Sequence, residues 1–276
     1  MPSAQANGTQ LYYELHGTSG DPVVLVHGSW VDHSSWSEVV PGFEQSMQVV
    51  AYDRRGHGAS PAVPRTRPVH DDAADLAGLL EALDLYPAHV VAHSYGAAVA
   101  LRLAVDRPEM VRSVVAHEPT YVGLLAGDAA TAPEAERLLD GIRALQRLVR
   151  AGDVETAAAQ FVDQFSSEPG AWDRLPELVR ARFRANAPRW VEEFDDPETL
   201  SPAPAPLAEL LIPVLLTEGS QSPPFLHRIT AALARLLRNG QVRELPDVGH
   251  VPHLTRPQQF VGVVLTYLLE RNVPVT

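Results

Sequence analysis

Residues 89–98, HVVAHSYGAA, decide the fold. An apolar run leads straight into Ser94, and a helical pattern begins directly after Gly96. A sharp strand-to-helix turn strains the residue at its apex and lifts that side chain above the sheet. Strand and helix backbones approach closely there, so small residues are needed two positions before and after the apex, and Ala92 and Gly96 are small. The stretch therefore predicts Ser94 as an exposed nucleophile near a helix N-terminus, which favours developing negative charge.

Similar short apolar runs recur along the chain, separated by helical patterns. The runs are rich in Val and Leu without strict alternation, which is typical of strands buried on both faces. Strands that alternate with helices predict an α/β fold with a mostly parallel central sheet flanked by helices. The expected strands are 23–26, 48–52, 89–92, 111–116, 214–216 and, more weakly, 241–245, and the expected helices are 70–85, 97–105, 226–237 and 258–269.

One long stretch, from about Thr120 to Pro206, breaks this alternation. It carries helical patterns and no convincing strand, and its three prolines at 202, 204 and 206 predict a stiff, extended return segment. We interpret it as a helical insertion between two strands of the main sheet. The chain is then divided into a core formed by residues 1–119 and 209–276 and an inserted segment formed by residues 120–208.

Composition excludes several classes of protein. Of 276 residues, 45% are hydrophobic and 20% charged, which is typical of a globular chain with a substantial core. The formal charge is −12 and all 22 basic residues are Arg, so we expect no nucleic-acid partner and no lysine chemistry. The absence of Cys excludes a thiolate nucleophile and thiolate metal sites. Without an apolar leader or a long apolar run, we expect a cytoplasmic protein that does not enter membranes.

Four motifs share their order and spacing with one known family. They are His27-Gly28-Ser29-Trp30 after the first expected strand, DRRGHGAS at 53–60 after the second, the Ser94 turn after the third, and Gly249-His250 before the last helix. From about Leu11 to Leu269 the chain resembles the α/β-hydrolase family. The resemblance implies an α/β-hydrolase fold in which residues 120–208 form a helical cap over the pocket.

The same resemblance implies roles for two backbone N–H groups. Those of Ser29 and Tyr95 match the positions that form the oxyanion hole of the family, where two donors stabilise a tetrahedral intermediate. Because the role belongs to the backbone, Ser29→Ala is expected to change little by itself. Trp30, Tyr95 and Val251 are our candidates for the substrate pocket.

His250 is our candidate for the general base. It lies in the segment PDVGHVP at 246–252, where Gly and Pro indicate a loop from which an imidazole can reach a serine. Neutral imidazole titrates in the range that this role needs.

The carboxylate that should orient His250 is less obvious. In most of the resembled family it follows the strand after the insertion, but this chain reads TEGSQSPP at 217–224, with no Asp after Gly219. Glu118, before Pro119 at the end of the preceding strand, occupies the position used in some branches of the family, and we favour it over Glu218. Asp247 is a third choice and is more typical of a turn residue.

These residues predict acyl transfer from a small-molecule substrate to Ser94, followed by hydrolysis. We expect a serine hydrolase that acts on a small, mostly apolar ester or lactone without a metal or cofactor. Two alternatives stay open: the same residues used for acyl transfer, C–C hydrolysis or a lyase step, and a small-molecule binding protein without catalysis. A homodimer is left open as well.

Overall fold

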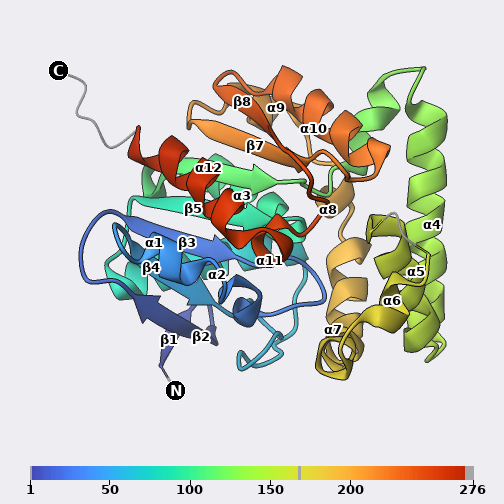
Figure 1. The fold of residues 1–276 in the computed structure, drawn as a ribbon, viewed down its shortest axis with the longest axis horizontal. Helices are drawn as coiled ribbons and strands as arrows, with labels where there is room; N and C mark the ends of the chain where they lie inside the picture. The colour runs from blue at the N-terminus through green and yellow to red at the C-terminus, as the bar shows by residue number, and fades with distance from the viewer. Residues whose placement is uncertain (1, 167–168, 271–276) are drawn as a thin grey trace.

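An eight-stranded sheet forms the centre of the described part of the chain (Figure 1). The computed structural model describes residues 2–166 and 169–270. The strand order is β1-β2-β4-β3-β5-β6-β7-β8. The pairs β1·β2 and β2·β4 are antiparallel, and all later pairs are parallel. The predicted fold class is therefore confirmed.

The six expected strands are present, and two were missed. The missed pair lies at the antiparallel edge of the sheet, where the side chains of β2 are half-exposed and no buried apolar run arises. The strands are β1 (Ser3–Ala6), β2 (Thr9–His16), β3 (Pro22–Val26), β4 (Gln48–Tyr52), β5 (Ala88–His93), β6 (Val111–His117), β7 (Val214–Gly219) and β8 (Gly240–Leu245).

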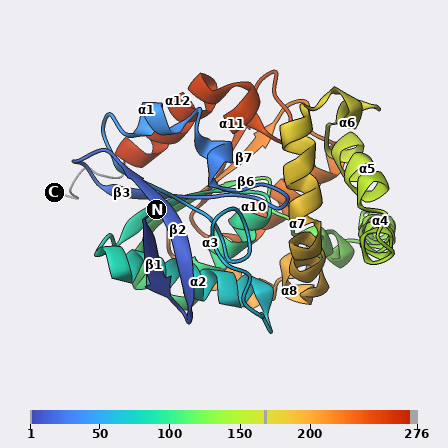
Figure 2. The same cartoon turned by 90° about the horizontal axis from the view of Figure 1, so that it is seen from below.

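Helices cover both faces of the sheet (Figure 2). Two separate apolar clusters result, one on each face. One face carries α1 (Val40–Phe43), α11 (Pro252–Thr255) and α12 (Pro257–Leu269), beside the 3-10 helix η1 (His33–Trp36). The other face carries α2 (Pro68–Leu83), α3 (Tyr95–Asp106) and α10 (Pro224–Leu236). The 3-10 helix η2 (Pro108–Met110) leads into β6. No helix in the described residues is both long and apolar enough to cross a bilayer.

Between β6 and β7 the described residues form helices and connecting loops, which we call the cap segment (residues 120–208). Its helices α4–α7 stand together at one end of the sheet (Figure 1). The prediction of an extended proline-rich return segment was wrong for residues 204–206, because Pro204 begins helix α9. Proline fits the first turn of a helix, where no backbone N–H is required. The elements are η3 (Val122–Gly127), α4 (Ala132–Arg150), α5 (Val154–Ser166), α6 (Ala171–Arg174), α7 (Glu177–Asp195), α8 (Pro197–Leu200) and α9 (Pro204–Glu209).

The register of the central strands positions the candidate site. His93 at the end of β5 pairs with His117 of β6, which in turn pairs with Thr217 of β7. The residues that follow, Ser94, Glu118 and Glu218, therefore emerge side by side at the carboxyl edge of the sheet. Ligands bind at this edge in open α/β sheets.

Candidate active site

Ser94 lies at the apex of the turn between β5 and α3. Its backbone has φ 55° and ψ −120°, a region that costs free energy for any residue with a side chain. The Ser94 N–H donates to the His117 carbonyl at 2.9 Å, which ties the turn to the neighbouring strand. Gly96 is required because a Cβ there would lie 2.4 Å from the Val26 carbonyl oxygen. The Ser94 side chain is thus held above the sheet by close packing beneath it.

The structure brings His250 and Glu118 together. The Oε2 atom of Glu118 accepts a hydrogen bond from His250 Nδ1 at 2.6 Å, and its Oε1 atom accepts one from the Gly219 N–H at 2.8 Å. Glu118 is buried and has φ 46°, a left-handed backbone that turns its side chain back along the sheet edge. Both carboxylate oxygens therefore have partners, one of which is the imidazole.

The surroundings of Glu118 hold it in the charged form. Burial opposes the charge, but neighbouring His117 and the hydrogen bond from His250 outweigh that cost and lower the pKa of Glu118 to about 2. Burial lowers the pKa of His117 itself to about 4. A charged carboxylate beside His250 Nδ1 favours the tautomer that carries its proton on this nitrogen and leaves Nε2 free to accept a hydrogen bond.

The two other candidate carboxylates lie elsewhere. Glu218 is level with Glu118 in the sheet register but lies within β7, and its Oε2 atom lies 3.3 Å from His227 Nδ1 on α10. Asp247 has φ 58°, and its backbone N–H donates to the Ser220 hydroxyl at 2.9 Å, as befits a turn residue. Of the three, Glu118 is the one in contact with His250.

Three of the candidate polar groups lack hydrogen-bond partners in the described part of the chain. Within the described residues, the Ser94 hydroxyl has no hydrogen-bond partner, and the backbone N–H groups of Ser29 and Tyr95 also donate to no protein group. A serine–histidine hydrogen bond is often long in a protein without substrate and tightens when substrate binds. An oxyanion hole requires backbone N–H groups that are free in this way.

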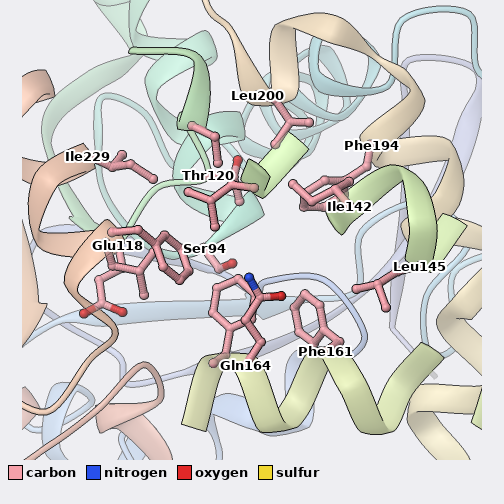
Figure 3. Close-up of a pocket in the computed structure, with 15 residues that line it drawn as sticks. Ser94, Glu118, Thr120, Ile142, Leu145, Phe161, Gln164, Phe194, Leu200 and Ile229 are labelled. Atoms are coloured by element: carbon pink, nitrogen blue, oxygen red, sulfur yellow. The ribbon is translucent and has the colours of Figure 1, made fainter. Parts of the chain in front are cut away.

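A largely apolar cavity opens beside Ser94 (Figure 3). It has about 520 Å³ of empty space, its open mouth included. Figure 3 shows Ser94 and Glu118 among side chains from the cap segment and α10, with the Gln164 amide directed into the cavity. The lining residues are Ser94, Glu118, Thr120, Val122, Leu138, Ile142, Leu145, Phe161, Gln164, Phe165, Phe194, Leu200, Phe225, Leu226 and Ile229.

The three residues predicted for the pocket do not line this cavity. Trp30 is fully buried, and its indole stacks on Trp190 with ring centroids 4.9 Å apart. The Tyr95 ring is buried beneath the turn, where the Arg54 guanidinium lies 4.5 Å from its centroid. Val251 leads into α11, away from the cavity lining. Trp30 and Tyr95 therefore point into the core, and Val251 is half-buried.

The lining residues that helices α4 and α5 of the cap segment supply were not predicted from the sequence. Leu138, Ile142 and Leu145 recur at helical spacing on α4, and Phe161, Gln164 and Phe165 do so on α5. The stripes are visible in the sequence. Nothing in the sequence indicates that they face a cavity rather than another helix.

Three groups of side chains in the described residues have the composition of a metal site, and one of them contains Glu118 and His250. Ligand atoms of His117, Glu118 and His250 lie within 4.8 Å of one another. However, His117 Nδ1 is hydrogen-bonded to the Thr217 hydroxyl at 3.0 Å, and both Glu118 oxygens are engaged as described above. The geometry is that of a hydrogen-bonded network around an imidazole.

Comparison with known proteins establishes the family. The profile of the alpha/beta hydrolase family matches residues 23–263, and the chain belongs to this family. It is 29% identical over 271 residues to 2-hydroxymuconate semialdehyde hydrolase of Pseudomonas sp. strain CF600, a match that covers 94% of this chain and 90% of that protein. The predicted α/β-hydrolase enzyme is thereby confirmed.

Two further matches are more limited. The chain is 34% identical to the putative carbamate hydrolase RutD of Azorhizobium caulinodans, over 114 residues that span 41% of this chain and 43% of that protein. The crystal structure of the enol-lactonase from Burkholderia xenovorans LB400 shares the fold, with a TM-score of 0.72, 19% identity and coverage of 97% of this chain and 100% of that one.

Proposed function

We propose that this chain is a serine hydrolase that cleaves a small, mostly apolar ester or lactone. The observation that carries the proposal is the contact between Glu118 and His250 at 2.6 Å, on the same sheet edge where the strained turn presents Ser94 to an apolar cavity. A nucleophile, a base and a group that orients the base are the three parts that acyl-enzyme chemistry requires.

In the proposed mechanism, His250 Nε2 takes the proton of the Ser94 hydroxyl as Oγ attacks the acyl carbon. The tetrahedral oxyanion accepts hydrogen bonds from the Ser29 and Tyr95 N–H groups. Collapse breaks the bond to the leaving alcohol, which takes the proton from His250 and leaves an acyl-serine. Water then attacks the acyl carbon with His250 as base, the bond to Ser94 Oγ breaks, His250 returns the proton to Oγ, and the carboxylic acid is released. Glu118 stays ionised throughout and stabilises the imidazolium.

The substrate class follows from the cavity wall. Most lining residues are aliphatic or aromatic, and the polar side chain of Gln164 in the cap segment is directed into the space. An apolar acyl or alcohol group with few hydrogen-bonding atoms suits such a wall. The lactonase and hydrolase activities in the names of the matched proteins are compatible with this class.

The test is hydrolysis of p-nitrophenyl acetate and butyrate by the wild type and by Ser94→Ala, with Ser37→Ala as the matched control. Ser37 is exposed at the end of η1 and does not line the cavity. We expect activity and labelling by a fluorophosphonate in the wild type and in Ser37→Ala, and neither in Ser94→Ala. Absence of both in the wild type would refute the proposal and favour a binding protein. Labelling without turnover of any ester would favour the non-hydrolytic reactions.

A further inference from the structure

The loop that carries the Ser29 N–H is strained. We call residues 28–31 the oxyanion loop. Trp30 in this loop has φ 69°, which is an outlier for a bulky side chain, and such a conformation persists only where the surroundings enforce it. The contacts that enforce it come from two directions.

From below, the loop is held by Arg54. This residue is buried, and its guanidinium donates to the carbonyl of His27 at 3.1 Å and to that of Gly28 at 3.0 Å. The same guanidinium lies over the Tyr95 ring. Arg54 therefore joins the two segments whose N–H groups would bind the oxyanion.

From above, the loop is held by helix α7 of the cap segment. Asn186, Trp190 and Glu193 lie at positions i, i+4 and i+7 and so share one face of the helix. Asn186 Nδ2 donates to the Trp30 carbonyl at 3.0 Å, and Trp190 stacks on the Trp30 indole. Three consecutive turns of one cap helix thus contact the oxyanion loop.

The third of these contacts is the nearest to the reacting atoms. The Ser29 hydroxyl donates to Glu193 Oε2 at 2.5 Å, while Glu193 Oε1 lies 2.7 Å from Arg54 Nη2. Glu193 and Arg54 are both fully buried. A buried pair of this kind gives little net stability compared with apolar packing, but it fixes the position of both groups firmly.

We propose that Glu193 is a positioning residue that holds the oxyanion loop through the Ser29 hydroxyl. This inference rests on the proposed serine hydrolase function. The hydroxyl and the N–H belong to the same residue, so a hydrogen bond to a fixed carboxylate sets the direction in which the N–H points. Because Glu193 belongs to the cap segment, the oxyanion hole is complete only when α7 is seated on the core. The cap segment then contributes to the rate as well as to substrate choice.

This role changes the expectation for Ser29. From the sequence, Ser29→Ala was expected to change little, since the oxyanion donor is a backbone group. The structure gives the hydroxyl a partner 164 positions away in the sequence. Loss of one oxyanion donor typically lowers the rate about 100- to 1000-fold, and misdirection of a donor that is still present should lower it less, by about 10- to 100-fold.

The experiment compares Ser29→Ala, Ser29→Thr, Glu193→Gln and the double variant Ser29→Ala/Glu193→Gln. Ser29→Ala leaves the Glu193–Arg54 pair intact and so is the variant least able to disturb folding. Glu192→Gln is the matched control, because Glu192 is the neighbouring residue on α7 and pairs with Arg65 at 3.2 Å and Arg189 at 2.8 Å instead of contacting the loop. The measurements are kcat and KM for p-nitrophenyl butyrate, the rate of fluorophosphonate labelling of Ser94, and Tm.

We expect Ser29→Ala to lower kcat and the labelling rate together by about 10- to 100-fold, with KM changed less than about threefold. Ser29→Thr should restore most of the loss, and the double variant should be no slower than the slower single variant, because both changes break one contact. Glu192→Gln should resemble the wild type.

The inference is overturned if Ser29→Ala keeps kcat within about twofold of the wild type, if only Tm falls, or if Glu192→Gln lowers kcat as much as Ser29→Ala does. A wild type without Ser94-dependent activity would instead refute the proposed function, and this inference with it.

Discussion

Replacing Glu118 with Gln would remove the charge that lies beside His250 while keeping the size of the side chain. The pKa of the Glu118 carboxyl falls from 4.5 to about 2 in the structure. That difference corresponds to about 3 kcal/mol in favour of the charged carboxylate. His250 supplies part of this interaction, and it becomes positively charged as Ser94 reacts. The loss of this negative charge alone should therefore lower kcat by up to about 300-fold.

The Glu118→Gln change would also disturb the proton on His250. The Gln amide can donate a hydrogen bond to His250 Nδ1 and so stabilise the tautomer that carries its proton on Nε2. In that tautomer Nε2 cannot accept the proton of Ser94; the same effect lowers kcat about 10⁴-fold in a serine protease. We expect a fall in kcat of about 10²- to 10⁴-fold, with KM nearly constant.

The assay is p-nitrophenyl butyrate hydrolysis, with Glu218→Gln as the matched control, since Glu218 lies next to His227 instead. Activity of Glu118→Gln within about threefold of the wild type would show that this carboxylate does not orient the base. An equal loss in Glu218→Gln would show that charge at the sheet edge matters more than the contact with His250.

Three further predictions concern stability and specificity. Gly96→Ala should lower the free energy of unfolding, measured in urea, by about 1–3 kcal/mol, because the new Cβ would lie 2.4 Å from the Val26 carbonyl oxygen. In the control Gly141→Ala on α4 the new Cβ meets nothing within 4 Å, so this change should be neutral or stabilising. Equal effects of the two changes would contradict the close packing at Gly96. Tm should fall as the pH is lowered from about 6.5 to about 4, because burial lowers the pKa of His117 to about 4 while the same side chain in the unfolded chain takes up its proton near pH 6.5. The contribution of neutral His117 to the free energy of unfolding is complete above about pH 6.5, and about 3 kcal/mol of it is lost on acidification. A Tm that stays constant between about pH 7 and pH 5 would refute this prediction. Ile142→Trp should narrow the cavity and lower kcat/KM for p-nitrophenyl octanoate at least about tenfold more than kcat/KM for p-nitrophenyl acetate. An equal loss of kcat/KM for both esters would mean that longer acyl chains do not occupy this cavity.

The strands and the principal helices could be predicted because their signals are local. A strand such as β4, residues 48–52, is buried on both faces and therefore appears as an unbroken apolar run. The turn at Ser94 needs small residues at fixed offsets, and these stand in the sequence. The antiparallel strands β1 and β2, at one side of the sheet, were missed because their side chains are partly exposed and form no such run.

The identity of the carboxylate beside His250 could not be derived in this way. Glu118 and Glu218 end adjacent parallel strands and emerge at the same sheet edge. What separates them is the left-handed backbone of Glu118 at φ 46°, just after the end of β6, and the place of Glu218 within β7, where its carboxylate lies next to His227. Backbone direction at a strand end depends on packing around it, which spacing in the sequence does not contain.

The sequence by itself determined the α/β architecture, the position of the candidate nucleophile Ser94 and the candidate base His250, since each depends on local pattern and motif order. Only the tertiary structure decided which carboxylate lies against His250, which cap side chains face the cavity, and that Glu193 reaches Ser29. The physical reason is distance along the chain: the contacts of Glu118 with His250 and of Glu193 with Ser29 join residues 132 and 164 positions apart, and they exist only after the sheet register and the seating of the cap segment have brought them together.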